Sequence, residues 1–177
     1  LETYAAEGWT WKLEGSGATL EVRNSTLRCL YDLHVTDCDV TFEDTLFVAT
    51  QDPLLHNCTV RMSRVDFDII WWLIMSNSTV EMSDVTFGNF GVVATFGGVS
   101  EWSNVSMYDG YQVSFMDGTP LIHDSEFTYV SMHFENCDGL VMEDCAVSGA
   151  WKTLMADCNG ALRNTTFSEC GLALDII

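Results

Sequence analysis

Apolar and polar positions alternate along this chain in a pattern that repeats every 20 residues. Counted in blocks of 20 from Gly17, the sixth and the eleventh positions are apolar in all eight blocks. The eighth position holds Asn or Asp in every block except the one that contains Arg64. A fixed period near 20 residues predicts a solenoid, because each short repeat can bury its apolar face only by stacking on its neighbours.

The spacing within a block predicts strands that are joined by corners. Val80 and Met82 are two residues apart, and so are Val85 and Phe87, as expected where alternate side chains of a strand face a core. Between the two pairs, Asp84 shifts the alternation by one residue, which indicates a corner in the left-handed backbone conformation that Asn and Asp tolerate. A third strand must then return the chain, and the β-prone segments 90–96 and 111–116 are its candidates.

The pattern of residues 80–87 is apolar, any, apolar, any, Asn or Asp, apolar, any, apolar, and it recurs along the chain. It resembles the single-stranded right-handed parallel β-helix, the superfamily of pectate lyases, polygalacturonases, phage tailspikes and many β-helix-repeat surface proteins. The resemblance covers roughly residues 17–177. It implies an all-β, right-handed parallel β-helix with about eight coils of 20 residues.

We expect one elongated domain. Residues 1–16 are out of register with the repeat and are predicted to form an N-terminal cap or lead-in segment, with Trp9 and Trp11 over the first coil. Residues 17–177 form the solenoid, whose C-terminal end we expect to be covered by further polypeptide or by another subunit. The sequence contains no apolar run of about 18 residues, so we expect no transmembrane segment.

A formal net charge of −19 limits the partners of the protein. Nucleic acid is excluded as an expected partner, because its binding needs clustered Lys and Arg. The acidic surface has two interpretations: it serves only to keep the protein hydrated, or it binds divalent cations. We expect no other cofactor. The candidate calcium ligands are Asp37 with Asp39 and Asp66 with Asp68, and neither pair matches an EF-hand loop or the nonapeptide calcium repeat.

Cysteines and glycosylation triplets each leave two interpretations open. Cys38 and Cys58 occupy the same position of adjacent blocks, so they are predicted to form a disulfide or to stack as free thiols. In a secreted glycoprotein the Asn-x-Ser/Thr triplets would accept glycans, but a repeat that needs Asn at its corners also generates such triplets by itself. The five asparagines are Asn24, Asn57, Asn77, Asn104 and Asn164.

An aromatic residue recurs in every second block at the fifteenth position. The candidates for stacking on carbohydrate are Tyr31, Trp71, Tyr111 and Trp151. Rings about 10 Å apart along the axis could stack on sugar rings or on the side chains of a partner. Alternatively, they fill a wide corner of the core while the Gly and Ser residues between them make room.

Several apolar residues are predicted to form a partner or assembly surface, because the segments that hold them are too apolar for a strand with a solvated face. One segment is the run that starts at Ile69. Another is the outward column that becomes apolar late in the chain, and a third is the chain end. The residues are Ile69, Ile70, Trp71, Trp72, Leu73, Ile74, Leu121, Val141, Ile176 and Ile177.

The even spacing of the blocks leaves no room for the long insertions from which the lyases and hydrolases of the resembled family build their clefts. Arg61 and Arg64 fall near Asp44 and Asp84 in the register, an arrangement that salt bridging explains. We therefore expect a non-catalytic, extracellular or cell-surface structural and adhesive module that acts as a scaffold or assembles, for example into a filament. A polysaccharide-binding or polysaccharide-degrading β-helix is the alternative. An ice-binding solenoid is a minor one, because the column of Thr is interrupted.

Overall fold

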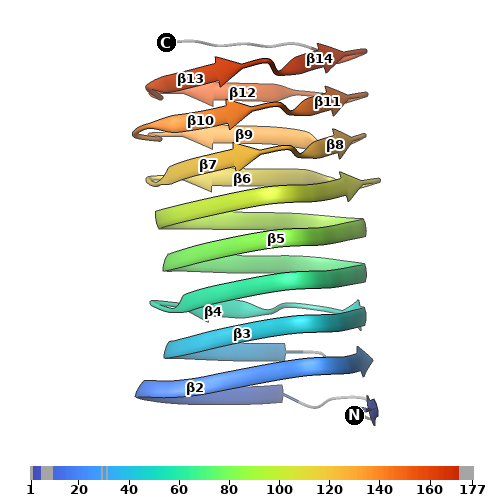
Figure 1. Ribbon diagram of the computed structural model, residues 1–177, viewed down its shortest axis with the longest axis vertical. Helices are drawn as coiled ribbons and strands as arrows, with labels where there is room; N and C mark the ends of the chain where they lie inside the picture. The colour runs from blue at the N-terminus through green and yellow to red at the C-terminus, as the bar shows by residue number, and fades with distance from the viewer. Residues whose placement is uncertain (1, 5–9, 29, 31, 172–177) are drawn as a thin grey trace.

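The computed structural model describes residues 2–4, 10–28, 30 and 32–171, and the side chains of 17–28, 30 and 33–171. The chain forms a parallel β-solenoid of about seven turns, so the predicted fold is confirmed and the expected coil count is close (Figure 1). The strands are β1 (Glu2–Tyr4), β2 (Thr10–Arg28), β3 (Asp32–Thr50), β4 (Leu54–His56), β5 (Thr59–Tyr108), β6 (Gln112–Met116), β7 (Thr119–His123), β8 (Glu126–Thr128), β9 (Ser131–Glu135), β10 (Leu140–Glu143), β11 (Ala146–Ser148), β12 (Thr153–Ala156), β13 (Gly160–Arg163) and β14 (Thr166–Ser168).

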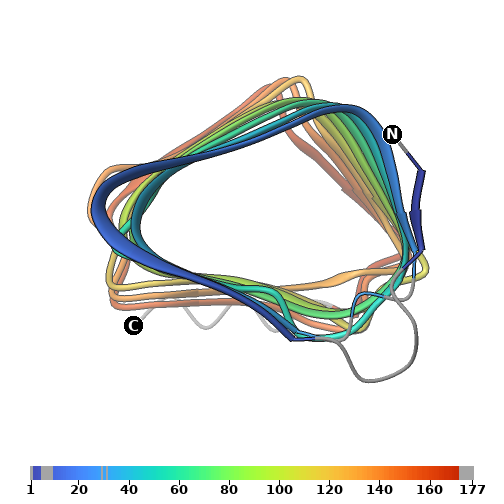
Figure 2. The same cartoon turned by 90° about the horizontal axis from the view of Figure 1, so that it is seen from below.

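The coils stack into three parallel ladders, which give the rod the roughly triangular outline seen in Figure 2. The first face contains β7, β10 and β13, in which Leu121 pairs with Val141 and Val141 with Ala161. The second face contains β8, β11 and β14. The third face contains β4, β6, β9 and β12, which confirms the predicted third strand at residues 112–116.

Each corner of the triangle contains a residue with a left-handed backbone. In the corner between the first and second faces, these residues include Asn24, Asp44 and Asn104, as the sequence predicts. The corner that precedes the first face uses Asn, Asp and Gly in the same way, as at Asn77. Because Asn and Asp reach this conformation at lower cost than other residues with a side chain, two of the three corners are encoded by residue type.

The core is a continuous stack of apolar side chains from successive coils. The rings of Phe47, Phe67 and Phe87 stack with centroid distances of 4.7 and 4.6 Å. Phe115 and Phe134 stack in the same way farther along the rod, at 5.2 Å. Burying one such ring contributes about 1.5–3 kcal/mol, so the repeat is held together by contacts between neighbouring coils.

The third face departs locally from the 20-residue period. Gln112 pairs with Ser131, one residue short of the period, and Met132 pairs with Thr153, one residue beyond it. The missing residue and the extra residue compensate each other, so the first face stays in register. The irregular spacing lies beside the exposed aromatic side chains described below.

At the N-terminal end, residues 10–14 of β2 pair with Asp32–Thr36 of β3, so the solenoid ladder begins before Gly17. The short strand β1 pairs with Thr26–Arg28. Trp9 and the side chain of Trp11 lie outside the described part of the molecule, and the cap around them stays a prediction.

Candidate functional site

The exposed aromatic side chains gather at the corner between the second and third faces. Seven of the nine large apolar side chains that are exposed in the described part of the chain belong to this corner. We call this group the aromatic edge, and it consists of Ile69, Trp71, Trp72, Tyr108, Tyr111, Tyr129 and Trp151. Contiguous exposed apolar surface on a soluble protein usually marks a contact site.

The aromatic column predicted from the sequence forms the centre of this edge. The backbone N–H of Ser131 donates to the carbonyl of Tyr111, and that of Gly171 to the carbonyl of Ala150, so the column runs along successive coils. Trp71, Tyr111 and Trp151 are 61%, 74% and 85% exposed. The interpretation that these rings fill the core is therefore wrong for these three, whereas Tyr31 lies outside the described residues.

The apolar run that begins at Ile69 is divided between core and surface. Ile70 and Leu73 are each 1% exposed, so they are core residues and do not belong to the predicted partner surface. Trp71 and Trp72 point outward, with exposures of 61% and 52%, and Ile74 is partly buried. Within this run, the predicted partner surface is therefore reduced to Ile69, Trp71, Trp72 and Ile74.

This third corner carries backbone strain that the other two largely avoid. Its left-handed residues include Ile69, with a φ of 61°, and Tyr129, with a φ of 55°. A bulky or β-branched side chain disfavours this conformation, and each such residue costs about 1–3 kcal/mol. Both side chains are exposed, so burial in the core does not offset that cost.

Rings on the edge pack closely against glycines of neighbouring coils. A Cβ atom on Gly88 would lie 2.7 Å from the hydroxyl oxygen of Tyr108, and one on Gly149 would lie 2.5 Å from Cδ1 of Tyr129. A ring that covers the next coil needs a residue without a side chain there. This packing explains why glycines stand at positions 88 and 149 beside Tyr108 and Tyr129.

A groove of about 540 Å³ lies between Tyr111 and Trp151, with Ser131 of the intervening coil between them. Its lining also includes Met132, Leu154, Gln112, His133 and Lys152. The site therefore combines two exposed rings and an apolar lining with a few polar side chains, the composition typical of a ligand site. Sequence reasoning found the two rings but missed the polar members, which belong to no repeated column.

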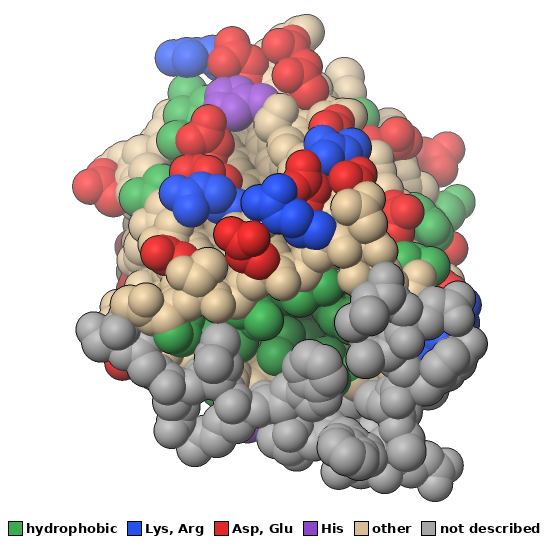
Figure 3. All heavy atoms as spheres, turned by 60° about the horizontal axis from the view of Figure 1, so that its bottom comes forward, with side chains coloured by type: hydrophobic (Ala, Val, Ile, Leu, Met, Phe, Trp, Pro, Cys, Tyr) green, Lys and Arg blue, Asp and Glu red, His purple; other side chains and the backbone are tan. Residues whose placement is uncertain are grey.

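The first face carries a second, more acidic groove of about 370 Å³, lined in part by Arg61, Glu81 and Glu101. Figure 3 shows basic side chains surrounded by acidic ones on the molecular surface. Nε of Arg61 lies 3.1 Å from Oε2 of Glu81. These side chains are about half exposed, and ion pairs of this kind add little stability.

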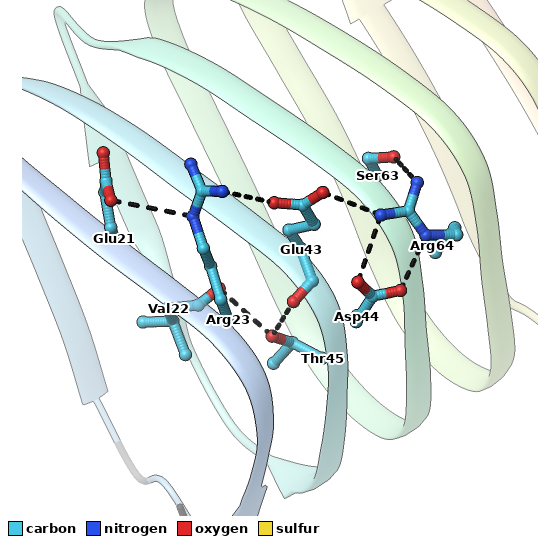
Figure 4. A network of polar contacts seen from close by, with 8 residues as sticks. All are labelled: Glu21, Val22, Arg23, Glu43, Asp44, Thr45, Ser63 and Arg64. Atoms are coloured by element: carbon cyan, nitrogen blue, oxygen red, sulfur yellow. Dashed lines mark hydrogen bonds and ion pairs between the residues drawn. The ribbon is translucent and has the colours of Figure 1, made fainter.

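Arg64 organises the neighbouring ion pairs, as Figure 4 shows. Its Nε donates to Oδ1 of Asp44 at 2.6 Å, and its Nη2 donates to Oε1 of Glu43 at 2.7 Å. The hydrogen bond from Arg64 lowers the pKa of Asp44 below its usual value of 3.8, and the same carboxylates raise the pKa of Arg64. The salt bridging predicted for Arg64 and Asp44 is therefore confirmed, while Arg61 pairs with Glu81 rather than with either aspartate.

The asparagines of the five glycosylation triplets all have exposed side chains. Three of them donate from Nδ2, the atom that would carry a glycan, to an aspartate of the preceding coil. These pairs are Asn57 with Asp37, Asn104 with Asp84, and Asn164 with Asp144. The amides thus have a structural role at the corners, and glycosylation at Asn24, Asn57, Asn77, Asn104 or Asn164 stays a prediction.

Cys38 and Cys58 lie at matching corners of adjacent coils, and each thiol donates to the backbone carbonyl two residues before it. The thiol of Cys58 donates to the carbonyls of Val35 and His56, a bridging role that the hydroxyl of Thr45 has at another corner. Burial raises the pKa of the Cys58 thiol. These contacts fit stacked thiols, and a disulfide between Cys38 and Cys58 stays a prediction.

The proposed calcium ligands lie in two different places. Asp37 accepts a hydrogen bond from Asn57 and lines a shallow surface hollow with Asp39, whereas Asp66 and Asp68 are exposed on the second face. Among the described residues, His, Cys, Asp and Glu form no group of three or more that could hold a metal ion. Calcium binding at either pair stays a prediction.

The remaining assembly residues are on the first face or at the chain end. Leu121 and Val141 pair in adjacent coils on the first face, and both are partly buried. Ile176 and Ile177 lie outside the described residues. Self-association through either region stays a prediction.

Comparisons with known proteins add no further assignment. No protein-family model matches the chain, and neither the curated proteins nor the solved structures gave a match. In the described part of the chain, no helix is long and apolar enough to cross a membrane. The functional argument therefore rests on the site itself.

Proposed function

We propose that this protein is a non-catalytic structural and adhesive β-helix module that works outside the cell or at its surface. The stacked coils serve as a scaffold, and the aromatic edge is the contact surface. The observation that carries the proposal is the gathering of exposed rings such as Trp71, Trp72 and Trp151 on one edge of a chain with a net charge of −19. Such a patch on an otherwise polar surface is typical of an interaction site.

The regular coils favour a scaffold over an enzyme. Arg61, which lines the groove of the first face, is engaged in an ion pair with Glu81, and Arg64 at the adjacent corner is engaged in one with Asp44. A rod that presents a linear edge can bind an extended partner without enclosing it. Assembly through Leu121 and Val141 or end to end would lengthen such a scaffold.

Two measurements test this proposal together. Purified protein is first incubated with soluble polysaccharides, and newly formed reducing ends are assayed; we expect none above the blank. Beads coated with the protein are then tested for retention on surfaces coated with extracellular polysaccharide or extracellular protein. Trp71→Ala/Trp72→Ala should reduce retention, because both rings are more than half exposed. Val99→Ala, an exposed apolar position away from the edge, is the matched control.

Two outcomes would overturn the proposal. Release of reducing ends that requires folded protein would identify an enzyme. Equal retention of the wild type, the double variant and the Val99→Ala control would show that the aromatic edge is not the contact surface.

A further inference from the structure

We propose that the groove between Tyr111 and Trp151 binds an uncharged polysaccharide chain, which runs along the rod axis with sugar rings stacked on the two aromatic rings. This inference rests on the proposed function, because it names the ligand class of the aromatic edge. It concerns one defined groove, lined by residues of three successive coils.

The geometry of the two rings provides the first argument. Tyr111 and Trp151 are separated by two coil steps, or about 10 Å, and the intervening position is the small residue Ser131. Both rings are largely exposed, at 74% and 85%, so a flat ligand can reach their faces. Aromatic side chains offer apolar contact area at low conformational cost, and the apolar faces of sugar rings match it.

The lining of the groove provides the second argument. Leu154 is apolar and partly exposed, whereas Ser131 and Lys152 offer polar groups for sugar hydroxyls. Gln112 also lines the groove, and its amide nitrogen donates to the hydroxyl of Ser114 at 2.6 Å, which fixes its orientation. A few polar groups beside stacked rings suit a ligand that is rich in hydroxyls.

Charge narrows the ligand class further. A net charge of −19 opposes the approach of acidic polysaccharides, and it also disfavours a second copy of this chain as the occupant of this groove. A neutral polysaccharide is not repelled by this charge, so its binding should depend little on salt concentration. A cationic ligand would be attracted by the same field, and its binding would weaken with salt.

The edge also continues beyond the groove. Trp71 and Trp72, with Gln51 and Asp52, line a smaller hollow of about 320 Å³ at the same corner. A long chain can contact both places at once, whereas a short oligosaccharide cannot. Affinity should therefore rise with chain length, as expected for linked binding sites.

The test is isothermal titration calorimetry of the full chain with four probes. Xyloglucan and galactomannan are the neutral probes, polygalacturonate is the acidic one and poly-lysine the basic one. We expect binding to at least one neutral probe, unchanged when about 0.5 M NaCl is added, because screening acts only on charges. Trp151→Ala should weaken this binding about tenfold, which corresponds to the loss of one stacked ring.

Three variants serve as controls. Tyr111→Phe keeps the ring and should retain binding, whereas Tyr111→Ala should weaken it about tenfold, as Trp151→Ala does. Val99→Ala should also bind like the wild type. Because Trp151 and Tyr111 are so exposed, their truncation should leave the circular dichroism spectrum unchanged.

Several results would overturn the inference. Salt-sensitive binding to poly-lysine alone would identify a cationic partner, and binding to polygalacturonate alone would identify an acidic one. Absence of binding to both neutral probes would reject the ligand class. If bead retention still depends on Trp71 and Trp72 in that case, only this inference fails and the adhesive function stands.

Discussion

Asn104 donates a hydrogen bond from Nδ2 to Oδ1 of Asp84 in the preceding coil, over 2.6 Å. Asn57 and Asp37 form the same contact at another corner. Stacked corners lie about 4.8 Å apart, so a column made only of Asp would place like charges in contact. Donors placed between the carboxylates solve this problem over most of the column, and Arg64 has that role beside Asp44, whereas Asp124 and Asp144 occupy adjacent positions. The corner column therefore supplies both the left-handed backbone and the balance of charge.

Asn104→Asp should destabilise the protein, because it places a further carboxylate between Asp84 and Asp124. We expect the free energy of unfolding to fall by about 1 kcal/mol at neutral pH. Urea denaturation followed by circular dichroism measures the effect. Asn104→Gly keeps access to the left-handed backbone without the charge and is the control. If Asn104→Asp is no less stable than that control, and the difference does not change under acidic conditions, the charge argument fails.

Phe67→Ala should remove the central ring of the Phe47, Phe67 and Phe87 stack and leave a cavity. The side chain of Phe67 is 3% exposed, so the expected loss of unfolding free energy is about 3–5 kcal/mol. Phe67→Leu retains most of the volume and should cost less. Chemical denaturation of both variants provides the comparison, and equal stabilities would contradict the stacked core.

Gly91→Ala should destabilise the third corner, because its Cβ would collide with the backbone carbonyl of Trp71. Overpacking against backbone costs about 1–3 kcal/mol. Gly88→Ala is the matched control, since its Cβ would meet only the exposed side chain of Tyr108, which can rotate away. Thermal unfolding of the two variants provides the comparison. A smaller decrease in melting temperature for Gly91→Ala than for Gly88→Ala would contradict this packing.

Cys137 should make the protein sensitive to alkali. Burial and the adjacent Cys158 raise the pKa of its thiol from 9.0 to about 12. A thiol with a raised pKa stabilises the fold fully below pH 9, and this contribution is lost as the pH rises from about 9 to 12. Cys137→Ser can keep the hydrogen bonds to the carbonyls of Phe115 and Glu135 but does not titrate there. The free energy of unfolding, measured between about pH 9 and 12, should fall less steeply with pH for the variant than for the wild type. Parallel curves would show that the Cys137 thiol is not the group responsible.

The sequence predicted the fold because its strongest signals are repeated columns. Two corners are marked by Asn, Asp or Gly, so the inward positions of the strands beside them, such as Val80 and Phe87, could be read directly. The third strand is predicted correctly because its segments 90–96 and 111–116 are β-prone, although its pairing departs from the 20-residue period.

The third corner is harder to predict, because Ile69 and Tyr129 are residue types that rarely adopt a left-handed backbone. Without that signal, the alternation of residues 70–73 could not be assigned. The pattern therefore predicts Ile70 and Leu73 on the surface, and one interpretation puts the exposed rings of the column into the core. The pattern also does not predict the groove, because its polar members Gln112, His133 and Lys152 belong to no repeated column.

Hydroxyl-radical footprinting of the protein with a bound neutral polysaccharide tests the central claim most directly, because Trp and Tyr side chains are readily oxidised and report their own exposure. The account predicts that Tyr111 and Trp151 become protected, while Arg61 and Glu81 on the first face stay as reactive as in the free protein. Protection confined to the first-face groove, with Tyr111 and Trp151 unchanged, would contradict it.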